Sequence, residues 1–357
     1  MTPGSNGAAQ TPDDLRTRWR EALDEGAQIL SRGPQVETGL SPKTPVWTRN
    51  KTTLYRYQPT TSSVRTTPVL LVYALINKPY VLDLRPENSF VRHLLDHGYD
   101  VFLLDWGTPG WEDRETSLDE LVGEHLPKAV ERMLRAAGAR EYTLVGYCMG
   151  GTMAAMHAAL RPEGVRNLIA LTAPIDFAQG GTFSVWAQRR HLDVSRVVKG
   201  LGNVPADVVN VGSKMLRPVT NFVLVQTTMW EKLLAGADMS TWLAINKWVN
   251  DGVPFPGAAF VQWIECFYQR NLLTAGKMRI GGAAVDLSSI TASLLTVAAS
   301  QDHIVPPQMA RSLNGLASST DNEYRELHGG HVGLLVGSGA RTTLWPRITD
   351  WLEPRSG

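Results

Sequence analysis

The sequence predicts an α/β fold: a mostly parallel β-sheet with helices on both faces and a large inserted cap. Over residues 69–172, continuous apolar runs alternate with longer amphipathic stretches, a pattern typical of buried parallel strands joined by helices. The alternation stops near residue 177 and returns near residue 293. The segment between these two points is therefore interpreted as an insertion into the sheet-forming part of the chain.

The predicted elements follow in chain order. A helix from Pro12 to about Gly33 precedes an outer, half-exposed strand over residues 53–58. Buried strands are expected at 69–75, 99–105, 142–147, 168–172 and 293–299, and a last strand at 322–327. Helices are expected near 89–97, 117–138, 151–160, 308–316 and 342–352. Pro127 is expected to kink the second of these helices.

These elements divide the chain into four parts. They are an N-terminal helical extension (1–45), the first part of the core (46–176), the cap (177–286) and the second part of the core (287–357). The cap segment contains five of the 11 tryptophans, and packing is their default role: Trp186, Trp230, Trp242, Trp248 and Trp263.

Composition excludes several classes of function. Lys and Arg number 35 against 34 Asp and Glu, and this balance argues against a nucleic-acid partner. The two cysteines, Cys148 and Cys266, are too few for a disulfide scaffold, and neither has zinc-ligand spacing, so no metal site is expected. The N-terminal residues lack signal-peptide regions, and glycines break the longest uncharged stretch, so we expect a cytoplasmic protein without a membrane span.

The most informative residues form a turn between a buried strand and a helix. The sequence there is GYCMGG (146–151), a G-x-nucleophile-x-G elbow with Cys148 in the nucleophile position. Gly146 and Gly150 are small where the strand and helix backbones pass close together. The backbone N–H of Met149, at the start of the helix, can face a developing oxyanion. An inert buried thiol is the alternative for Cys148, and the elbow context makes it the weaker interpretation.

A cysteine nucleophile needs a base and an acidic partner, and in folds with this elbow the chain order is nucleophile, acid, histidine. Asp302 directly follows the strand predicted at 293–299, and His331 follows the last predicted strand. Each residue alone could be a loop or capping residue. In this order, and after these strands, the two residues are predicted to complete a catalytic set with Cys148.

Four other side chains are further candidates for the site or for structural roles near it: His303, His328, Asp176 and Cys266. His303 neighbours Asp302 and is weakly favoured as a supporting residue. His328 could compete with His331, and Asp176 could replace the acid, but strand-end and capping roles fit them better. Cys266 is expected to be a packing residue.

A second oxyanion donor should come from the loop after the first buried strand. We expect it to be the backbone N–H of Ile76 or Asn77, with a plain turn as the alternative.

With these residues in place, the sequence resembles the polyhydroxyalkanoate synthase family, specifically its short catalytic subunits of class III or class IV. The resemblance extends over most of the chain. It rests on the segments INKPYVLDL (76–84), DWGTP (105–109), GYCMGG (146–151), WVND (248–251), PFPG (254–257), DHIVPP (302–307) and GHVG (330–333). Met149 is more similar to class IV or archaeal members than to the glutamine of many class III proteins.

The resemblance implies an α/β-hydrolase fold and an acyltransferase without a cofactor, since the coenzyme A thioester is the substrate. By resemblance, Cys148 carries the acyl group, His331 is the base, and Asp302 orients His331 or activates the incoming hydroxyl. The substrates would be an (R)-3-hydroxyacyl-CoA, foremost 3-hydroxybutyryl-CoA, and the growing polyester chain. The resemblance also implies a second, non-homologous subunit, a homodimer or hetero-oligomer, and a place at the surface of polyester granules.

Three competing functions remain open from the sequence. One is a cysteine hydrolase similar to dienelactone hydrolases, whose smaller chains share the elbow but lack a large Trp-rich insertion. Another is a cysteine-dependent thioesterase or polyester depolymerase, which would release free hydroxy acid. A third is a granule-associated binding protein with a synthase fold, against which the intact set of Cys148, Asp302 and His331 argues.

Overall fold

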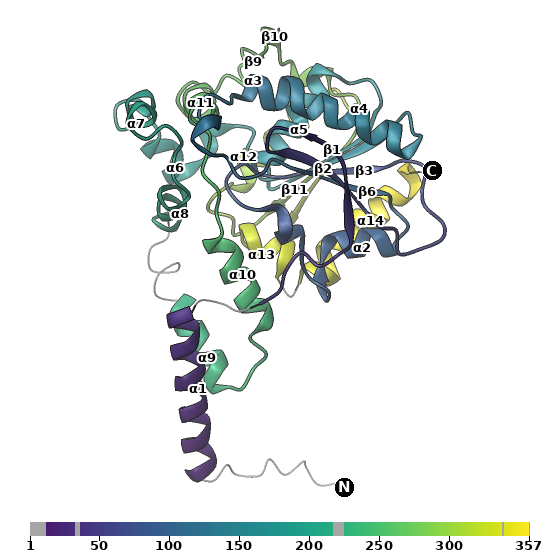
Figure 1. The fold of residues 1–357 in the computed structure, drawn as a ribbon. Coiled ribbons are helices and arrows are strands. Elements are labelled where there is room, and N and C mark those ends of the chain that lie inside the picture. Colours follow the sequence, from purple (N-terminus) through teal and green to yellow (C-terminus); the bar gives the residue numbers. More distant parts are fainter. Residues whose placement is uncertain (1–11, 33–35, 217–224, 338, 357) are drawn as a thin grey trace.

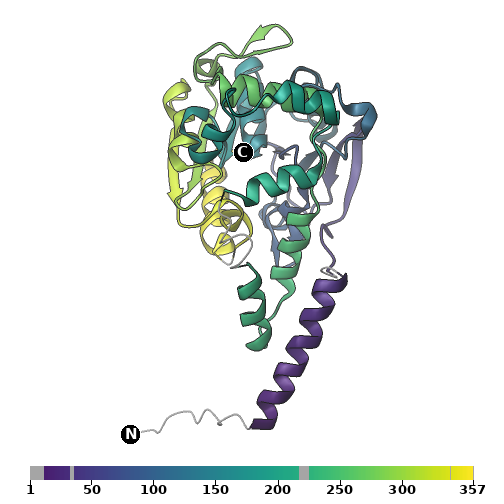
Figure 2. The ribbon, with the colours of Figure 1, turned by 90° about the vertical axis from the view of Figure 1, so that its left-hand side faces the viewer.

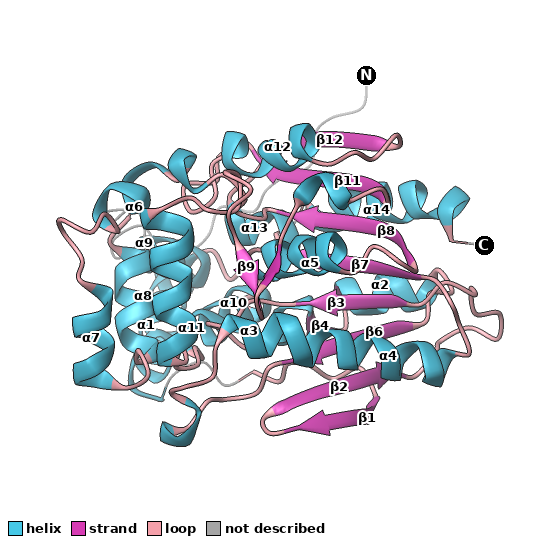
Figure 3. Ribbon diagram, turned by 90° about the horizontal axis from the view of Figure 1, so that it is seen from above, coloured by secondary structure: helices cyan, strands magenta, loops and turns pink. Residues whose placement is uncertain are grey.

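The computed structural model describes residues 12–32, 36–216, 225–337 and 339–356. Its centre is an eight-stranded sheet with the order β1-β2-β6-β3-β7-β8-β11-β12 (Figure 3). The strands are β1 (Lys43–Arg49), β2 (Thr52–Tyr57), β3 (Val69–Val72), β6 (Val101–Asp105), β7 (Tyr142–Tyr147), β8 (Val165–Leu171), β11 (Ser293–Ala299) and β12 (Asn322–Leu327). All pairings from β6 to β12 are parallel, which confirms the predicted mostly parallel sheet.

The antiparallel edge contains a strand that the sequence analysis missed. β1 pairs with β2, and β2 pairs with β6, both antiparallel. The register of β1 shifts between Pro45 and Trp47, and its residues are half-buried or exposed. The proline and the weak apolar alternation made β1 unrecognisable as a strand from its sequence. Both features are tolerated in an edge strand because one side of that strand has no hydrogen-bonded neighbour.

Helices cover both faces of the sheet (Figure 1). On one face lie α3 (Leu118–Glu120), α4 (Leu126–Ala137), α5 (Met149–Leu160) and α12 (Pro307–Leu316). On the other face lie α2 (Phe90–Asp96), α13 (His331–Val336) and α14 (Trp345–Leu352). The short helix α13 was not predicted, because six residues are too few to display a helical period.

The helix predicted over 117–138 has a more detailed structure than a single proline kink. Its start is confirmed, since the Ser117 side chain accepts a hydrogen bond from the Glu120 N–H. A π-helical turn, Leu121–His125, then separates α3 from α4. Pro127 lies in the first turn of α4, where a missing N–H does little harm. The π-helical turn thus takes up the change in hydrogen-bond register next to the proline.

Between β8 and β11 the chain is mainly helical, as expected. The helices are α6 (Gly181–Trp186), α7 (Val194–Leu201), α8 (Ala206–Lys214), α9 (Val225–Leu234), α10 (Ser240–Asn250) and α11 (Gly257–Gln262), followed by a π-helical segment, Trp263–Gln269. They lie beyond the carboxyl ends of the parallel strands (Figure 3). A small hairpin, β9 (Arg279–Ile280) with β10 (Ala283–Ala284), was not predicted. Residues 217–224 of the predicted cap lie outside the described residues, and its boundaries stay a prediction.

Helix α1 (Pro12–Arg32) extends away from the sheet and packs along α9 (Figures 1 and 2). Ala22 contributes to a small apolar cluster with Met229, Leu233 and Met239, separate from the main core. Trp19 and Leu23, on the predicted apolar face, are more than half exposed, at 54% and 53%. The predicted helix end at Gly33, and residues 1–11 of the predicted extension, lie outside the described residues.

Helix α5 is buried at every residue except Leu160, because the sheet lies below it and other helices surround it. His157 therefore sits in the core, where its ring nitrogen shares a 2.9 Å hydrogen bond with the Tyr142 hydroxyl. Burial lowers the pKa of His157 from the ordinary 6.5 to about 3. The histidine is consequently neutral in the folded protein at neutral pH.

This buried histidine predicts an acid-sensitive stability. The unfolded chain binds a proton at His157 below its ordinary pKa of 6.5, whereas the folded chain does not until about 3, so stability falls as pH drops through this window. Between pH 7 and pH 5, His157 is expected to lower the free energy of unfolding by about 2 kcal/mol. We expect His157→Gln, which can keep a bond to Tyr142, to flatten the pH dependence of the urea unfolding free energy by this amount. The matched control is the exposed His328→Gln, which should keep the wild-type slope; an unchanged slope in His157→Gln would contradict the prediction.

Candidate active site

The nucleophile elbow has the predicted strand–turn–helix structure. Cys148 lies between β7 and α5 with φ 54° and ψ −128°, in a backbone region that residues other than glycine rarely adopt. A Cβ atom on Gly146 would lie 2.4 Å from the Gly151 Cα, and one on Gly150 would lie 2.1 Å from the Val72 carbonyl oxygen. The glycines are thus required by close backbone contacts on both sides of Cys148.

Asp302 and His331 are brought together at the carboxyl ends of β11 and β12. The His331 Nδ1 and the Asp302 Oδ2 are 2.6 Å apart, and both residues are buried. The other carboxylate oxygen, Oδ1, accepts hydrogen bonds of 2.9 Å from the N–H groups of Ile304 and Val305. These bonds fix the carboxylate, so it can orient the imidazole ring and stabilise its positive charge.

The imidazole of His331 is influenced by both Asp302 and Cys148. Burial alone would lower the pKa of His331, but the charges of Asp302 and Cys148, together with the hydrogen bond to Asp302, outweigh burial and hold that pKa well above 6.5. The Tyr147 hydroxyl donates a 3.1 Å hydrogen bond to the His331 carbonyl, and the two rings are 5.3 Å apart. The three predicted residues therefore lie together: His331 is hydrogen-bonded to Asp302, and it lines the same cavity as Cys148.

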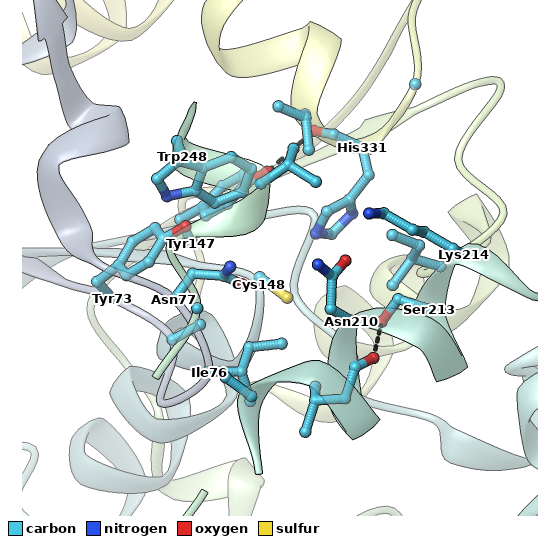
Figure 4. A pocket seen from close by; sticks show the side chains of 18 of the residues that line it. Tyr73, Ile76, Asn77, Tyr147, Cys148, Asn210, Ser213, Lys214, Trp248 and His331 are labelled. Carbon is cyan, nitrogen blue, oxygen red and sulfur yellow. Dashed lines mark hydrogen bonds between the residues drawn. The ribbon is translucent and has the colours of Figure 1, made fainter. Parts of the chain in front are cut away.

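A cavity of about 320 Å³ opens at these residues. Figure 4 shows Tyr73, Asn77 and Trp248 on one side of Cys148, with Asn210, Ser213 and Lys214 of α8 on the other. The cavity walls thus come from both the sheet side and the inserted helices. They are largely apolar, and only a few polar groups reach the space around the sulfur.

The predicted supporting residues also lie around this cavity. Ile76, Asn77 and His303 line it together with Cys148. Met149 is the first residue of α5, so its N–H is among those that helix geometry leaves without an intrahelical acceptor. The oxyanion roles of Met149, Ile76 and Asn77, and the supporting role of His303, stay predictions.

The competing candidates have other places in the structure. Asp176 caps the short 3₁₀ helix Phe177–Gln179 by accepting from the Ala178 N–H, and it also accepts from the Asn271 amide. His328 is exposed at the end of β12. Cys266 is half-buried in the π-helical segment, and burial raises the pKa of its thiol. None of these side chains lines the cavity at Cys148.

Sequence reasoning missed most of the cavity wall. Tyr147 and Trp248 belong to the segments GYCMGG (146–151) and WVND (248–251), so these segments could have indicated that both residues lie at the site. Asn210, Ser213 and Lys214 lie on one face of α8, in a segment without a motif. Helical periodicity could have placed them on a common face, but nothing in the sequence shows that this face meets Cys148.

Among residues 12–32, 36–216, 225–337 and 339–356, no three His, Cys, Asp or Glu side chains are grouped so that they could hold a metal ion. In that same part of the chain, no helix combines the length and the apolar character needed to cross a membrane.

Comparisons with known proteins identify the family. Residues 67–338 match the alpha/beta hydrolase fold model, and residues 36–94 match the model for the N-terminus of poly-beta-hydroxybutyrate polymerase. The Paleococcus ferrophilus monoacylglycerol lipase structure superimposes with a TM-score of 0.53 at 17% identity, covering 85% of this chain and 99% of its own, which supports the fold alone.

Two relatives carry the name poly(3-hydroxyalkanoate) polymerase subunit PhaC. The protein from Haloferax mediterranei is 34% identical over 96% of this chain and 71% of its own length. The protein from Allochromatium vinosum is 35% identical over 96% of this chain and 98% of its own. These matches show that the chain belongs to the poly(3-hydroxyalkanoate) polymerase family and has an α/β-hydrolase fold.

Proposed function

We propose that this protein is a CoA-releasing acyltransferase that polymerises (R)-3-hydroxyacyl-CoA, foremost 3-hydroxybutyryl-CoA, into polyhydroxyalkanoate. The observation that carries the proposal is the position of Cys148, which lies at a strained elbow and shares one cavity with His331, whose imidazole is held by Asp302. The names of the relatives supply the product class.

In the proposed acylation, His331 takes the thiol proton as the Cys148 sulfur attacks the thioester carbonyl carbon. The carbonyl oxygen becomes an oxyanion, which the N–H groups of Met149 and of Ile76 or Asn77 stabilise. When the carbonyl re-forms, the bond to the CoA sulfur breaks, and His331 returns the proton to that sulfur. Asp302 stabilises the imidazolium that exists between these two transfers.

In the proposed elongation, the 3-hydroxyl of a second acyl unit attacks the Cys148 thioester. His331 accepts the hydroxyl proton and returns it to the Cys148 sulfur as the C–S bond breaks. An ester bond forms, and the cysteine is free again. The first step exchanges one thioester for another, so the acyl group stays activated for this attack, whereas a serine ester would be less activated.

The largely apolar cavity supports acyl transfer over hydrolysis. Side chains from α8 and from α10 line the cavity on opposite sides of the sulfur. Such a wall limits the access of water, which would compete with the hydroxyl of the next acyl unit for the thioester.

The proposal includes the cellular setting expected from the family resemblance. A second, non-homologous subunit of the class III or class IV type, assembling with one or more copies of this chain, would complete the enzyme. No cofactor is required, because the coenzyme A thioester is itself the substrate. The complex would work in the cytoplasm at the surface of polyester granules.

The proposal predicts that Cys148→Ala retains the fold but forms no acyl-enzyme, because the attacking sulfur is gone. The measurement is CoA release from (R)-3-hydroxybutyryl-CoA, with and without the second subunit, followed by sizing of the product. Wild-type protein should give high-mass polyester, and Cys148→Ala should give neither CoA nor polymer. The control is Cys266→Ala, which should retain activity.

Other results would support the competing functions. CoA release with only free 3-hydroxybutyrate would indicate a thioesterase. Normal CoA release by Cys148→Ala would reject the nucleophile. No release by wild-type protein, even with the second subunit, would reject the substrate and leave the binding-protein alternative.

The proposal also predicts a pH signature for Asp302→Asn. His331 must be neutral to accept the thiol proton, and its pKa is held well above 6.5, mainly by Asp302. The wild-type acylation rate should therefore rise with pH through a midpoint above 6.5. Removing the Asp302 charge takes away the largest contribution that raises the pKa of His331 and leaves burial opposed only by Cys148, so the midpoint should move to lower pH. The plateau should fall by roughly 10²–10⁴-fold.

The measurement is the pre-steady-state burst of CoA between pH 5.5 and 9. The matched control is Asp176→Asn, whose carboxylate lies outside the cavity and whose midpoint should equal that of the wild type. A midpoint that stays in place in Asp302→Asn would contradict the assigned role of Asp302.

A further inference from the structure

The loop that carries the predicted oxyanion donors is held by one carboxylate from the inserted segment. Asp251 follows α10, and its Oδ1 lies 2.9 Å from the Lys78 ammonium nitrogen. Its Oδ2 accepts a 3.1 Å hydrogen bond from the Tyr80 hydroxyl. Lys78 and Tyr80 flank Pro79, so a single side chain fixes the loop on both sides of its proline.

Backbone and indole contacts extend this attachment along the loop. The Trp248 indole N–H donates a 2.8 Å hydrogen bond to the Lys78 carbonyl. The Val253 N–H donates a 3.0 Å hydrogen bond to the Ile76 carbonyl, and Asn77 pairs with Gly252 in an antiparallel bridge. The segment 248–253 thus contacts the loop 76–80 from end to end.

Gly252 shows how closely the two segments approach. A Cβ atom there would lie 3.2 Å from the Ala206 Cβ and 3.4 Å from the Ile76 carbonyl oxygen. Ala206 belongs to α8, the helix that forms the far wall of the cavity. The loop after β3, the end of α10 and the start of α8 are therefore packed as one unit beside Cys148.

Hydrogen bonding at an oxyanion depends strongly on position. The donors must lie about 2.7–3.1 Å from the place where the negative charge develops. A misplacement of about 1 Å can cost roughly 100-fold in rate. Ile76 and Asn77 belong to a loop rather than to a helix or strand, so the accuracy of their N–H groups must come from what holds the loop.

We propose that Asp251 is a positioning residue that fixes the loop 76–80. The backbone N–H groups of this loop can then meet the oxyanion formed at Cys148. This inference rests on the proposed function, since it assigns the oxyanion site of the same reaction. The inference gives a role to a contact network that lies beside the proposed nucleophile, base and acid but contains none of them. This network consists of Lys78, Tyr80, Trp248 and Asp251.

The test compares two reactions of the same sulfur in Asp251→Ala. Acylation by (R)-3-hydroxybutyryl-CoA produces an oxyanion, whereas alkylation by iodoacetamide displaces iodide at a saturated carbon and produces none. Both reactions use the Cys148 sulfur, and they are measured in a Cys266→Ala background so that alkylation reports on Cys148 alone. We expect acylation, measured as the CoA burst, to fall by at least ~10-fold, while alkylation stays within about twofold of the wild-type rate.

Two variants sharpen the comparison. Asp251→Asn keeps an oxygen for the Tyr80 hydroxyl but loses the charge opposite Lys78, so its acylation rate should lie between those of Asp251→Ala and the wild type. Glu124→Gln removes a comparable ion pair, with Arg49, away from Cys148, and should leave both reactions within twofold.

An unchanged acylation rate in Asp251→Ala would overturn the inference, and so would an equal loss in both reactions, which would indicate general damage to the site. If wild-type protein does not accept the hydroxyacyl-CoA, the proposed substrate fails. The inference is then tested with a simple aryl thioester, which also forms an oxyanion on attack, and the same selective loss is expected.

Discussion

The backbone conformation of Cys148 is the constraint on which the site depends. A non-glycine residue at φ 54° is strained by roughly 1–3 kcal/mol, and the surrounding structure must supply this energy. The Cys148 N–H donates a 2.9 Å hydrogen bond to the Leu171 carbonyl, and the Gly151 N–H donates one to the Cys148 carbonyl. Because the turn is fixed from β8 and from α5, the sulfur projects beyond the sheet toward the cavity.

The parallel sheet explains how distant parts of the chain meet at this sulfur. The carboxyl ends of parallel strands lie along one edge, where open α/β sheets bind their ligands. The elbow follows β7, the loop 76–80 follows β3, Asp302 follows β11 and His331 follows β12. The residues that need accurate placement therefore follow the rigid ends of strands. Each loop has only a short distance to cover between its strand and the Cys148 sulfur.

This arrangement also explains which features could be predicted from the sequence. β7 and β11 have the predicted bounds because their apolar runs are nearly continuous, and β12 has them although only Tyr324 and Leu327 of its six residues are apolar. Asp302 and His331 were placed from chain order after β11 and β12. β1 escaped prediction because Pro45 and an exposed edge weaken its pattern. The place of α8 escaped as well, since the contact of Asn210 with the cavity depends on long-range packing, which a local pattern does not contain.

The sheet and the elbow by themselves do not separate acyl transfer from hydrolysis. A lipase structure shares the fold at a TM-score of 0.53 although only 17% of the aligned residues are identical, and a shared fold does not determine the reaction. Two features of this chain favour acyl transfer over hydrolysis. The proposed nucleophile is a cysteine, which would keep the acyl group activated, and α8 and α10 contribute to a cavity wall that is largely apolar as a whole. If the end of α10 also holds the oxyanion loop, as proposed, the same insertion that limits water sets the geometry of acylation. A displacement of this insertion would then both admit water and weaken acylation, so efficient acyl transfer would require the insertion to stay in place.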